Sequence, residues 1–310
     1  MSKFLSGKWF TLLLMVTNVV IFALHPTTST DVYQLLQLGA NFAPYTLANE
    51  PHRLITCMFL HGGLIHLVVN MYSLYFIGQQ VEGSIGSVKF ALLYLITGLF
   101  ASLSSLYFNL FTISVGASGA IFGIYGFHLI KVIRANSEDR QSIILNFIIY
   151  IVVLTLAGNA LNFDNAAHFG GLFAGALIGL VKNNKKLPLA YLGGVLILFI
   201  TYWAIPRTQV RYYETYQEIR SIDERTVKIF QSPLTNEDFF DSLERIKEIP
   251  AQTAAKLRRI SGLDKDLSTD TLVLQTLLDI RDQQIAYFLR GLTEESYVYL
   301  DSVEAQTERF

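Results

Sequence analysis

The stretch SVGASGAIFG at residues 114–123 surrounds Ser118 with glycine and alanine at the start of an apolar segment. Small residues let neighbouring membrane helices approach closely, so a helix-packing seam explains the pattern. A serine between glycines also suits a nucleophile, because no Cβ bulk shields its hydroxyl from a peptide backbone. The rest of the chain decides between these two interpretations.

The composition of the chain is that of a membrane protein with a polar extension. Of the 310 residues, 52% are hydrophobic and 16% are charged, against about a quarter charged in soluble domains. Residues 1–206 hold 10 Lys+Arg and 6 Asp+Glu, whereas residues 207–310 hold 14 and 19. The overall charge near zero gives no indication of nucleic-acid binding.

Several apolar segments approach the length of about 20 residues that a membrane-spanning helix needs. They are residues 9–24, 63–81, 88–108, 114–131, 143–161, 166–181 and 187–205. The first follows two lysines, as a secretory signal does, but ALHPTTS after it is a poor cleavage site, so we expect an uncleaved helix. The sequence predicts an all-α polytopic membrane protein. It comprises a six-helix core at 1–186, a seventh transmembrane helix at 187–206 and a small, mostly helical soluble domain at 207–310.

The basic residues predict the orientation, because Lys and Arg concentrate in cytoplasmic loops. With a cytoplasmic N-terminus, nine of the ten basic residues before residue 207 are cytoplasmic, and Arg53 alone lies outside. Seven spans then place the domain at 207–310 outside the cytoplasm. We expect a multi-pass protein of the cell membrane, of bacterial type. The second, fourth and sixth spans all begin on the outer side, so their first halves share one depth.

These three spans carry polar residues in their first halves. His61, His66 and Asn70 stand in FLHGGLIHLVVN, Ser118 in GASG, and His168 in DNAAHFGG. Polar side chains within a membrane are costly and indicate function by default. Each also has a structural explanation, since a serine can bond to its own helix, an asparagine to another helix, and a histidine to interfacial water. Their shared depth favours one common site.

The chemistry that these residues suit is acyl transfer. Ser118 is the candidate nucleophile and His168 the candidate base, because neutral imidazole accepts a hydroxyl proton near pH 7. Asp164, four residues earlier, is expected to be solvated in the outer loop, so the pattern predicts a dyad. The candidate oxyanion donors are Asn70, His66 and the backbone N–H groups of Ala117 and Ser118.

Glycines on two spans make the packing and catalytic interpretations compatible. Gly116 and Gly119 flank the serine and leave room for a substrate backbone. Gly171, Gly175 and Gly179 recur every four residues, which suits close contact with the span that carries the serine. We expect this contact to bring the nucleophile and the base together.

The cysteine count excludes an intramolecular disulfide, and the sequence offers no metal-binding pattern. Cys57 has no second cysteine with which to form an intramolecular disulfide, and an apolar setting favours a packing role for it. Patterns such as C-x-x-C, which would indicate a metal site, do not occur in the sequence.

The ordered set of motifs resembles the rhomboid family of intramembrane serine proteases. It comprises GAN at 39–41, HRLIT at 52–56, FLHGGLIHLVVNMYSL at 59–74, Glu82 with Gly86, GASGAIFG at 116–123 and AHFGGLFAG at 167–175. The resemblance implies that Ser118 is the nucleophile, His168 the base, and His66 and Asn70 oxyanion stabilisers. It further implies single-pass transmembrane proteins as substrates, cleavage near the outer leaflet of the lipid bilayer, and no metal or cofactor.

Two residues depart from the pattern of that family. His52 stands where an aromatic residue often precedes the arginine of the first loop, and Phe122 stands where tyrosine often follows the nucleophile by four residues. Phe122 can still stack on the ring of His168. Glu82 and Arg53 match family positions that brace the first loop and the cytoplasmic end of the second span. The residues expected to support the dyad are Gly116, Gly119, Phe122 and Gly171.

Two other functions stay open. A catalytically silent rhomboid-like protein would bind membrane helices without cutting them, although the intact Ser118, His168 and Asn70 argue against it. A transporter would carry polar residues through the full depth of several spans and an inverted repeat, and neither pattern is evident.

The polar domain has the periodicity of several helices. We expect helices over 212–230, 235–249, 251–261, 269–290 and 293–307, with Thr235 as an N-cap and Pro250 as a helix end. Mixed charges on apolar-periodic helices indicate a solvated bundle. Dimerisation and substrate capture are its alternative roles.

Overall fold

The structure, a computed structural model, consists of helices. It describes residues 8–28, 31–109, 112–135, 140–160, 164–205, 207–231, 241–242, 244–261, 278–279, 282–283, 285–286 and 289. The described residues contain no strand and one isolated bridge, between Asn41 and Ser114, so the all-α prediction is confirmed. The chain divides into two compact units, Met1–Pro206 and Arg207–Phe310.

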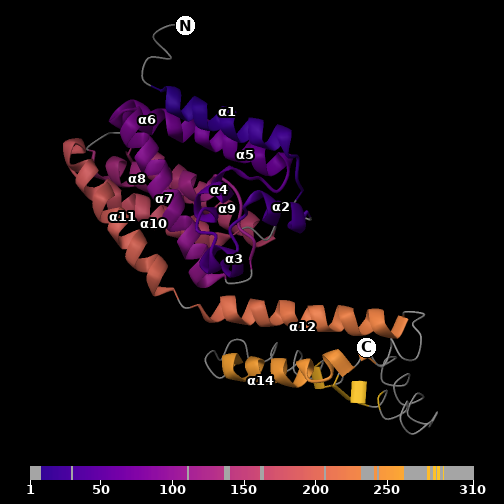
Figure 1. Cartoon of the computed structure of the whole chain (residues 1–310). Coiled ribbons are helices and arrows are strands. Elements are labelled where there is room, and N and C mark those ends of the chain that lie inside the picture. Colours follow the sequence, from indigo (N-terminus) through magenta and orange to yellow (C-terminus); the bar gives the residue numbers. More distant parts are fainter. Residues whose placement is uncertain are drawn as a thin grey trace. The chain divides into compact units, whose positions relative to one another are not determined.

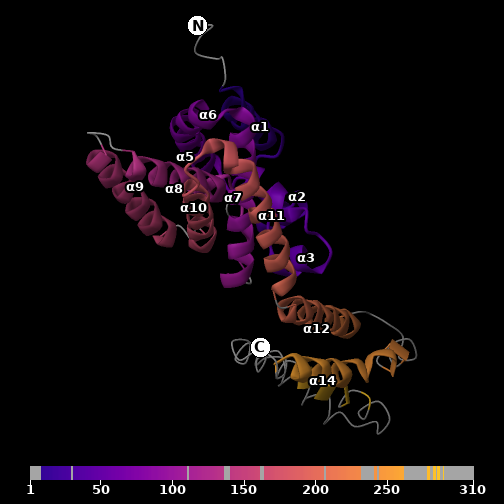
Figure 2. The same ribbon diagram turned by 90° about the vertical axis from the view of Figure 1, so that its left-hand side faces the viewer.

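Within the described part of the first unit, a helix stands at each of the predicted apolar segments. These helices are α1 (Trp9–Leu24), the continuous run of α5 (Leu64–Ser73), η2 (Leu74–Gly78) and α6 (Gln79–Ile85), then α7 (Ser87–Phe108), α8 (Ser118–Arg134), α9 (Arg140–Ala160), α10 (Asn165–Gly179) and α11 (Leu187–Ala204). In Figure 2, α8 and α10 lie between α9 on one side and α7 with α11 on the other.

Few of these helices are by themselves long and apolar enough to cross a membrane. Two pass that test, namely α7 and the segment Asn184–Ala204. A third does so if the bent pair Arg53–Phe59 and Leu64–Ile85, which meet at 93°, forms one span. The helix α1 and the segment Arg140–Val153 are shorter apolar helices. The count of seven spans therefore stays a prediction.

The packing of α8 against α7 and α10 depends on glycine. A Cβ added at Gly171 would collide with the carbonyl oxygen of Gly119, and one added at Gly175 with that of Gly123. A Cβ at Gly119 itself would come within 2.5 Å of Ala101 on α7. The glycines of α10 thus admit the backbone of α8, and those of α8 admit α7. The predicted contact between α8 and α10 is present.

The carboxylate of Glu82, at the end of the second apolar segment, is fully buried. It accepts hydrogen bonds from the backbone N–H groups of Phe10 (2.9 Å) and Thr11 (2.8 Å) and from the hydroxyl of Ser87 (2.5 Å). Because these donors lie in the first turns of α1 and α7, Glu82 ties the starts of both helices to α6.

The loop between α1 and α5 folds around the buried Arg53. Its short helices are α2 (Val32–Leu38), α3 (Ala43–Ala48), α4 (Arg53–Thr56) and η1 (Cys57–Phe59). The guanidinium donates to the carbonyl oxygens of Leu36 (2.6 Å) and Ala40 (3.0 Å) and to the carboxylate of Glu50 (2.8 Å). His52 lies 3.9 Å from that carboxylate at the exposed edge of the cluster. Arg53 therefore braces the first loop, as predicted.

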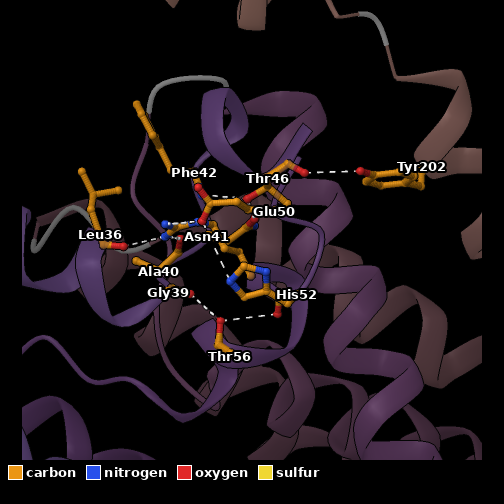
Figure 3. Close-up of polar contacts among 11 residues, drawn as sticks. Leu36, Gly39, Ala40, Asn41, Phe42, Thr46, Glu50, His52, Thr56 and Tyr202 are labelled. Carbon is orange, nitrogen blue, oxygen red and sulfur yellow. Dashed lines mark hydrogen bonds and ion pairs between the residues drawn. The ribbon is translucent and has the colours of Figure 1, made fainter. Parts of the chain in front are cut away.

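Asn41 connects this loop to the segment that precedes α8. Its backbone N–H and C=O pair with Ser114 at 3.0 and 2.9 Å, and its side-chain amide donates to the carbonyl of Ser102 at 2.9 Å. Its Oδ1 accepts a hydrogen bond from Thr46 at 2.9 Å. The carbonyl of Thr46 in turn accepts a hydrogen bond from Tyr202 of α11 at 3.3 Å (Figure 3). The first loop thus holds the chain at Ser114, four residues before Ser118.

The second unit contains α12 (Thr208–Gln231) and α14 (Ile249–Ser261), which lie side by side (Figure 1). The predicted helices at 212–230 and 251–261 are therefore confirmed. Pro250 does not end a helix as predicted but lies in the first turn of α14, where its missing N–H has no intrahelical partner to lose. The described residues between 278 and 289 are helical, whereas Thr235 and residues 293–307 lie outside the described residues.

Candidate active site

Ser118 and His168 meet where α8 and α10 begin. Ser118 is the first residue of α8, and its Oγ lies 2.8 Å from Nε2 of His168, the fourth residue of α10. The imidazole is 6% exposed, and its Nδ1 has no hydrogen-bond partner among the described residues. The structure therefore brings the two predicted residues into a hydrogen bond.

The ring of Phe122 covers one face of the imidazole of His168. The two rings are parallel within 4°, and their centroids are 4.4 Å apart. Phe122 lies one turn after Ser118 on α8, so the same helix supplies the hydroxyl and the stacking surface. The predicted stacking is present.

The turn before Ser118 requires a glycine. Gly116 has a φ of 120°, a conformation that side chains disfavour, and its N–H donates to the carbonyl of Cys57 at 2.9 Å. A Cβ at Gly116 would also lie 2.8 Å from the Cε1 atom of His66. The glycine thus lets the imidazole of His66 approach the backbone beside the serine.

The imidazole of His66 and the amide of Asn70 face the dyad from α5. Both side chains line a small cavity of about 30 Å³ together with Ser118 and His168. Asn70 is 3% exposed, and its Nδ2 donates to the carbonyl of His66 at 2.8 Å. Its Oδ1 has no partner among the described residues. The four polar residues predicted to share one depth are therefore assembled around one space.

A larger cavity of about 360 Å³ also reaches the dyad. Its lining includes Ser118 and His168, the polar side chains of His66, Ser102 and Asp164, and small residues of α7 and α8. The polar side chains beside Ser118 suit water, and the apolar remainder of the lining together with this volume suits an extended segment of polypeptide.

His61 is buried beside the site. The alternative explanation for it, contact with interfacial water, is wrong, because it is 1% exposed and its ring packs edge-on against that of His66 with 5.2 Å between centroids. The hydroxyl of Thr27, after α1, donates to the carbonyl of His61 at 2.5 Å. The chain that follows α1 therefore closes over His61, which local sequence does not indicate.

The expectation that Asp164 is solvated is also wrong. Its Oδ1 accepts hydrogen bonds from the amide of Asn109 at 2.7 Å and from the N–H of Ala167 at 3.1 Å, and its Oδ2 is buried. Asp164 is the N-cap of α10. An aspartate directly before an apolar helical segment is a known N-cap pattern, and that signal was available in DNAAHFGG.

The described part of the chain contains no cluster of three or more His, Cys, Asp or Glu side chains that could hold a metal ion.

The sequence of the chain is similar to a known family and to several known proteins. Residues 48–185 match the family model described as the Rhomboid domain. The chain is 30% identical over 309 residues to Rhomboid protease GluP of Bacillus subtilis (strain 168), covering 95% of this chain and 56% of that relative. It is 35% identical over 171 residues to Rhomboid protease AarA of Providencia stuartii, covering 47% and 61%. It is 41% identical over 135 residues to RHOMBOID-like protein 1 of Arabidopsis thaliana, covering 43% and 35%. The chain thus spans less than two thirds of the length of each of these relatives.

Proposed function

Because this chain belongs to the rhomboid family, we propose that it is an intramembrane serine endopeptidase with Ser118 as nucleophile and His168 as base. The observation that carries the proposal is the 2.8 Å contact between Ser118 Oγ and His168 Nε2. A serine hydroxyl is a weak nucleophile until a neighbouring base accepts its proton, and this contact supplies that base.

The reaction proceeds in two halves. Nε2 of His168 takes the proton of Ser118 as Oγ attacks the carbonyl carbon of the scissile peptide bond. The protonated imidazole then gives this proton to the leaving amine, and an acyl-enzyme ester forms at Ser118. Water, deprotonated by the same imidazole, attacks the ester, and the proton returns to Ser118 as the acid product leaves.

The negative charge on the tetrahedral intermediate needs hydrogen-bond donors. Asn70 and His66 line the cavity beside Ser118, and the N–H groups of Ala117 and Ser118 lie at the start of α8. N–H groups of a first helical turn lack intrahelical acceptors and carry the positive end of the helix dipole. These groups form the oxyanion site of the proposal.

The substrates are transmembrane segments of other, single-pass membrane proteins. Lipid leaves no partner for an exposed backbone group, so a peptide bond within a membrane helix is protected until the helix unwinds. The cavity of about 360 Å³, which has polar side chains beside Ser118, receives the unwound segment and the water that hydrolyses the ester. Cleavage then occurs near the outer leaflet of the cell membrane, at the depth that the predicted orientation gives the dyad.

A silent, helix-binding relative is the alternative, and a serine-reactive probe separates the two. A fluorophosphonate should label the wild-type protein in detergent and should not label Ser118→Ala. Ser84→Ala is a matched control, because the hydroxyl of Ser84 bonds within its own helix to the carbonyl of Val81. Absence of wild-type labelling in a folded sample would favour the silent alternative.

A further inference from the structure

We propose that Asn109 and Asp164 form a clamp that positions His168 against Ser118. The inference rests on the proposed function, because it assigns the clamp to the base of that dyad. Asn109 is the C-cap of α7, and Asp164 is the N-cap of α10. Their side chains join at 2.7 Å across 55 residues of sequence.

The carboxylate of Asp164 organises the turn that carries the base. Its Oδ1 accepts the N–H of Ala167 at 3.1 Å, while its backbone carbonyl accepts the N–H of His168 at 3.2 Å. The backbone of His168 is therefore bonded directly to the residue that Asn109 holds. A movement of Asp164 would move the first turn of α10 and the imidazole with it.

Asn109, the other residue of the clamp, ends α7, and α7 packs against α8. Ala101, two turns earlier on α7, contacts Gly119 immediately after Ser118. The helix α7 is thus a common support for the nucleophile and for the base. Because general-base catalysis depends on sub-ångström placement, a misplacement of about 1 Å costs on the order of 100-fold in rate.

Exchange of the two side chains tests this positioning role. Asn109→Asp places two carboxylates face to face, and we expect kcat for a reporter membrane helix to fall about 10- to 100-fold. Asp164→Ala removes both bonds to Oδ1 and should have a similar effect. Asp164→Asn keeps an oxygen that accepts from Asn109 and from Ala167, so kcat should stay within about threefold of wild type.

The double variant Asn109→Asp with Asp164→Asn is the decisive measurement. It restores the bond with its polarity reversed, since the new amide donates to the new carboxylate. Because Oδ1 of Asp164 accepts from both Asn109 and Ala167 in the wild type, the new amide must turn about its χ2 angle so that its nitrogen faces residue 109 while its oxygen stays on the N–H of Ala167. We expect kcat to recover to within about threefold of wild type and the rate of fluorophosphonate labelling to recover with it. Asn183→Ala is the matched control, because it removes a side-chain cap (to the N–H of Lys185, 2.9 Å) from another helix, η3 (Asn184–Lys186).

The outcomes separate this inference from the proposed function. Thermal unfolding of each variant shows whether stability alone has changed. The clamp is refuted if Asn109→Asp keeps the kcat of the wild type, if the double variant does not recover, or if Asp164→Asn loses as much as Asp164→Ala. A folded wild-type protein that neither labels nor cleaves contradicts the proposed function instead.

Discussion

The ring of Phe122 lies parallel to the imidazole of His168, with 4.4 Å between centroids and 4° between planes. The imidazole of His168 therefore has one face against a rigid hydrocarbon ring and one nitrogen on the hydroxyl of Ser118. In this arrangement the imidazole has little freedom to rotate away from the nucleophile.

Replacement of Phe122 tests the value of the stacked ring. Phe122→Ala leaves a void beside the imidazole, and we expect kcat to fall about tenfold or more while the loss of buried aromatic surface destabilises the fold by about 3–5 kcal/mol. Phe122→Tyr keeps the ring and should retain activity. Cleavage rates and thermal unfolding of both variants measure the effect, and an unimpaired Phe122→Ala enzyme would rule out this role.

Replacement of Gly116 tests the turn before Ser118. Gly116→Ala combines an unfavourable φ of 120° with a Cβ placed 2.8 Å from His66. We expect it to lower stability by about 1–3 kcal/mol and to abolish labelling of Ser118. Gly193→Ala on α11 is the control, since a Cβ there meets no atom within 4 Å and the backbone is helical. Equal labelling of the two variants would show that the turn tolerates a side chain.

The oxyanion assignment predicts a separation of catalysis from binding. Asn70→Ala removes an amide that lines the cavity beside Ser118, and loss of one oxyanion donor costs on the order of 100- to 1,000-fold in kcat. KM should change little, because the donor acts on charge that develops in the transition state. The exposed Gln80 on α6 supplies a control, Gln80→Ala. Wild-type kcat in Asn70→Ala would remove this residue from the oxyanion site.

The predicted orientation places the second unit outside the cytoplasm. A protease added to intact cells should therefore degrade residues 207–310 and leave an N-terminal tag intact. A cytoplasmic marker protein serves as the control for cell integrity. Full protection of the second unit in intact cells, with degradation after lysis, would contradict the seven-span topology.

The helices and the pairing of α8 with α10 were predictable, because apolar runs and glycine spacing are local signals. The glycines that recur every four residues on α10 predict a close helix contact, and in the structure Gly171 admits the carbonyl of Gly119 on α8. The approach of Ser118 to His168 was predicted from the common depth that the expected orientation gives the two spans.

Apart from the pair Ser118 and His168, the polar contacts over long sequence separations described here were not predictable. The partner of Asp164 is Asn109, 55 residues earlier, and no local pattern links them. The burial of His61 likewise depends on Thr27, 34 residues earlier, which lies over it only in the folded chain. Such contacts depend on tertiary packing, whereas amphipathic periodicity and caps depend on neighbours in sequence.

If Ser118 attacks peptide bonds within membrane helices, its removal should stop cleavage by the purified protein in a lipid bilayer. Purified wild-type protein, Ser118→Ala and Ser84→Ala are reconstituted in lipid vesicles with a single-pass reporter, and cleaved product is identified by mass spectrometry. We expect cleavage within the transmembrane segment by the wild type and by Ser84→Ala, and a loss of about 1,000-fold or more in the cleavage rate of Ser118→Ala. Undiminished cleavage by a folded Ser118→Ala protein would contradict this role of Ser118.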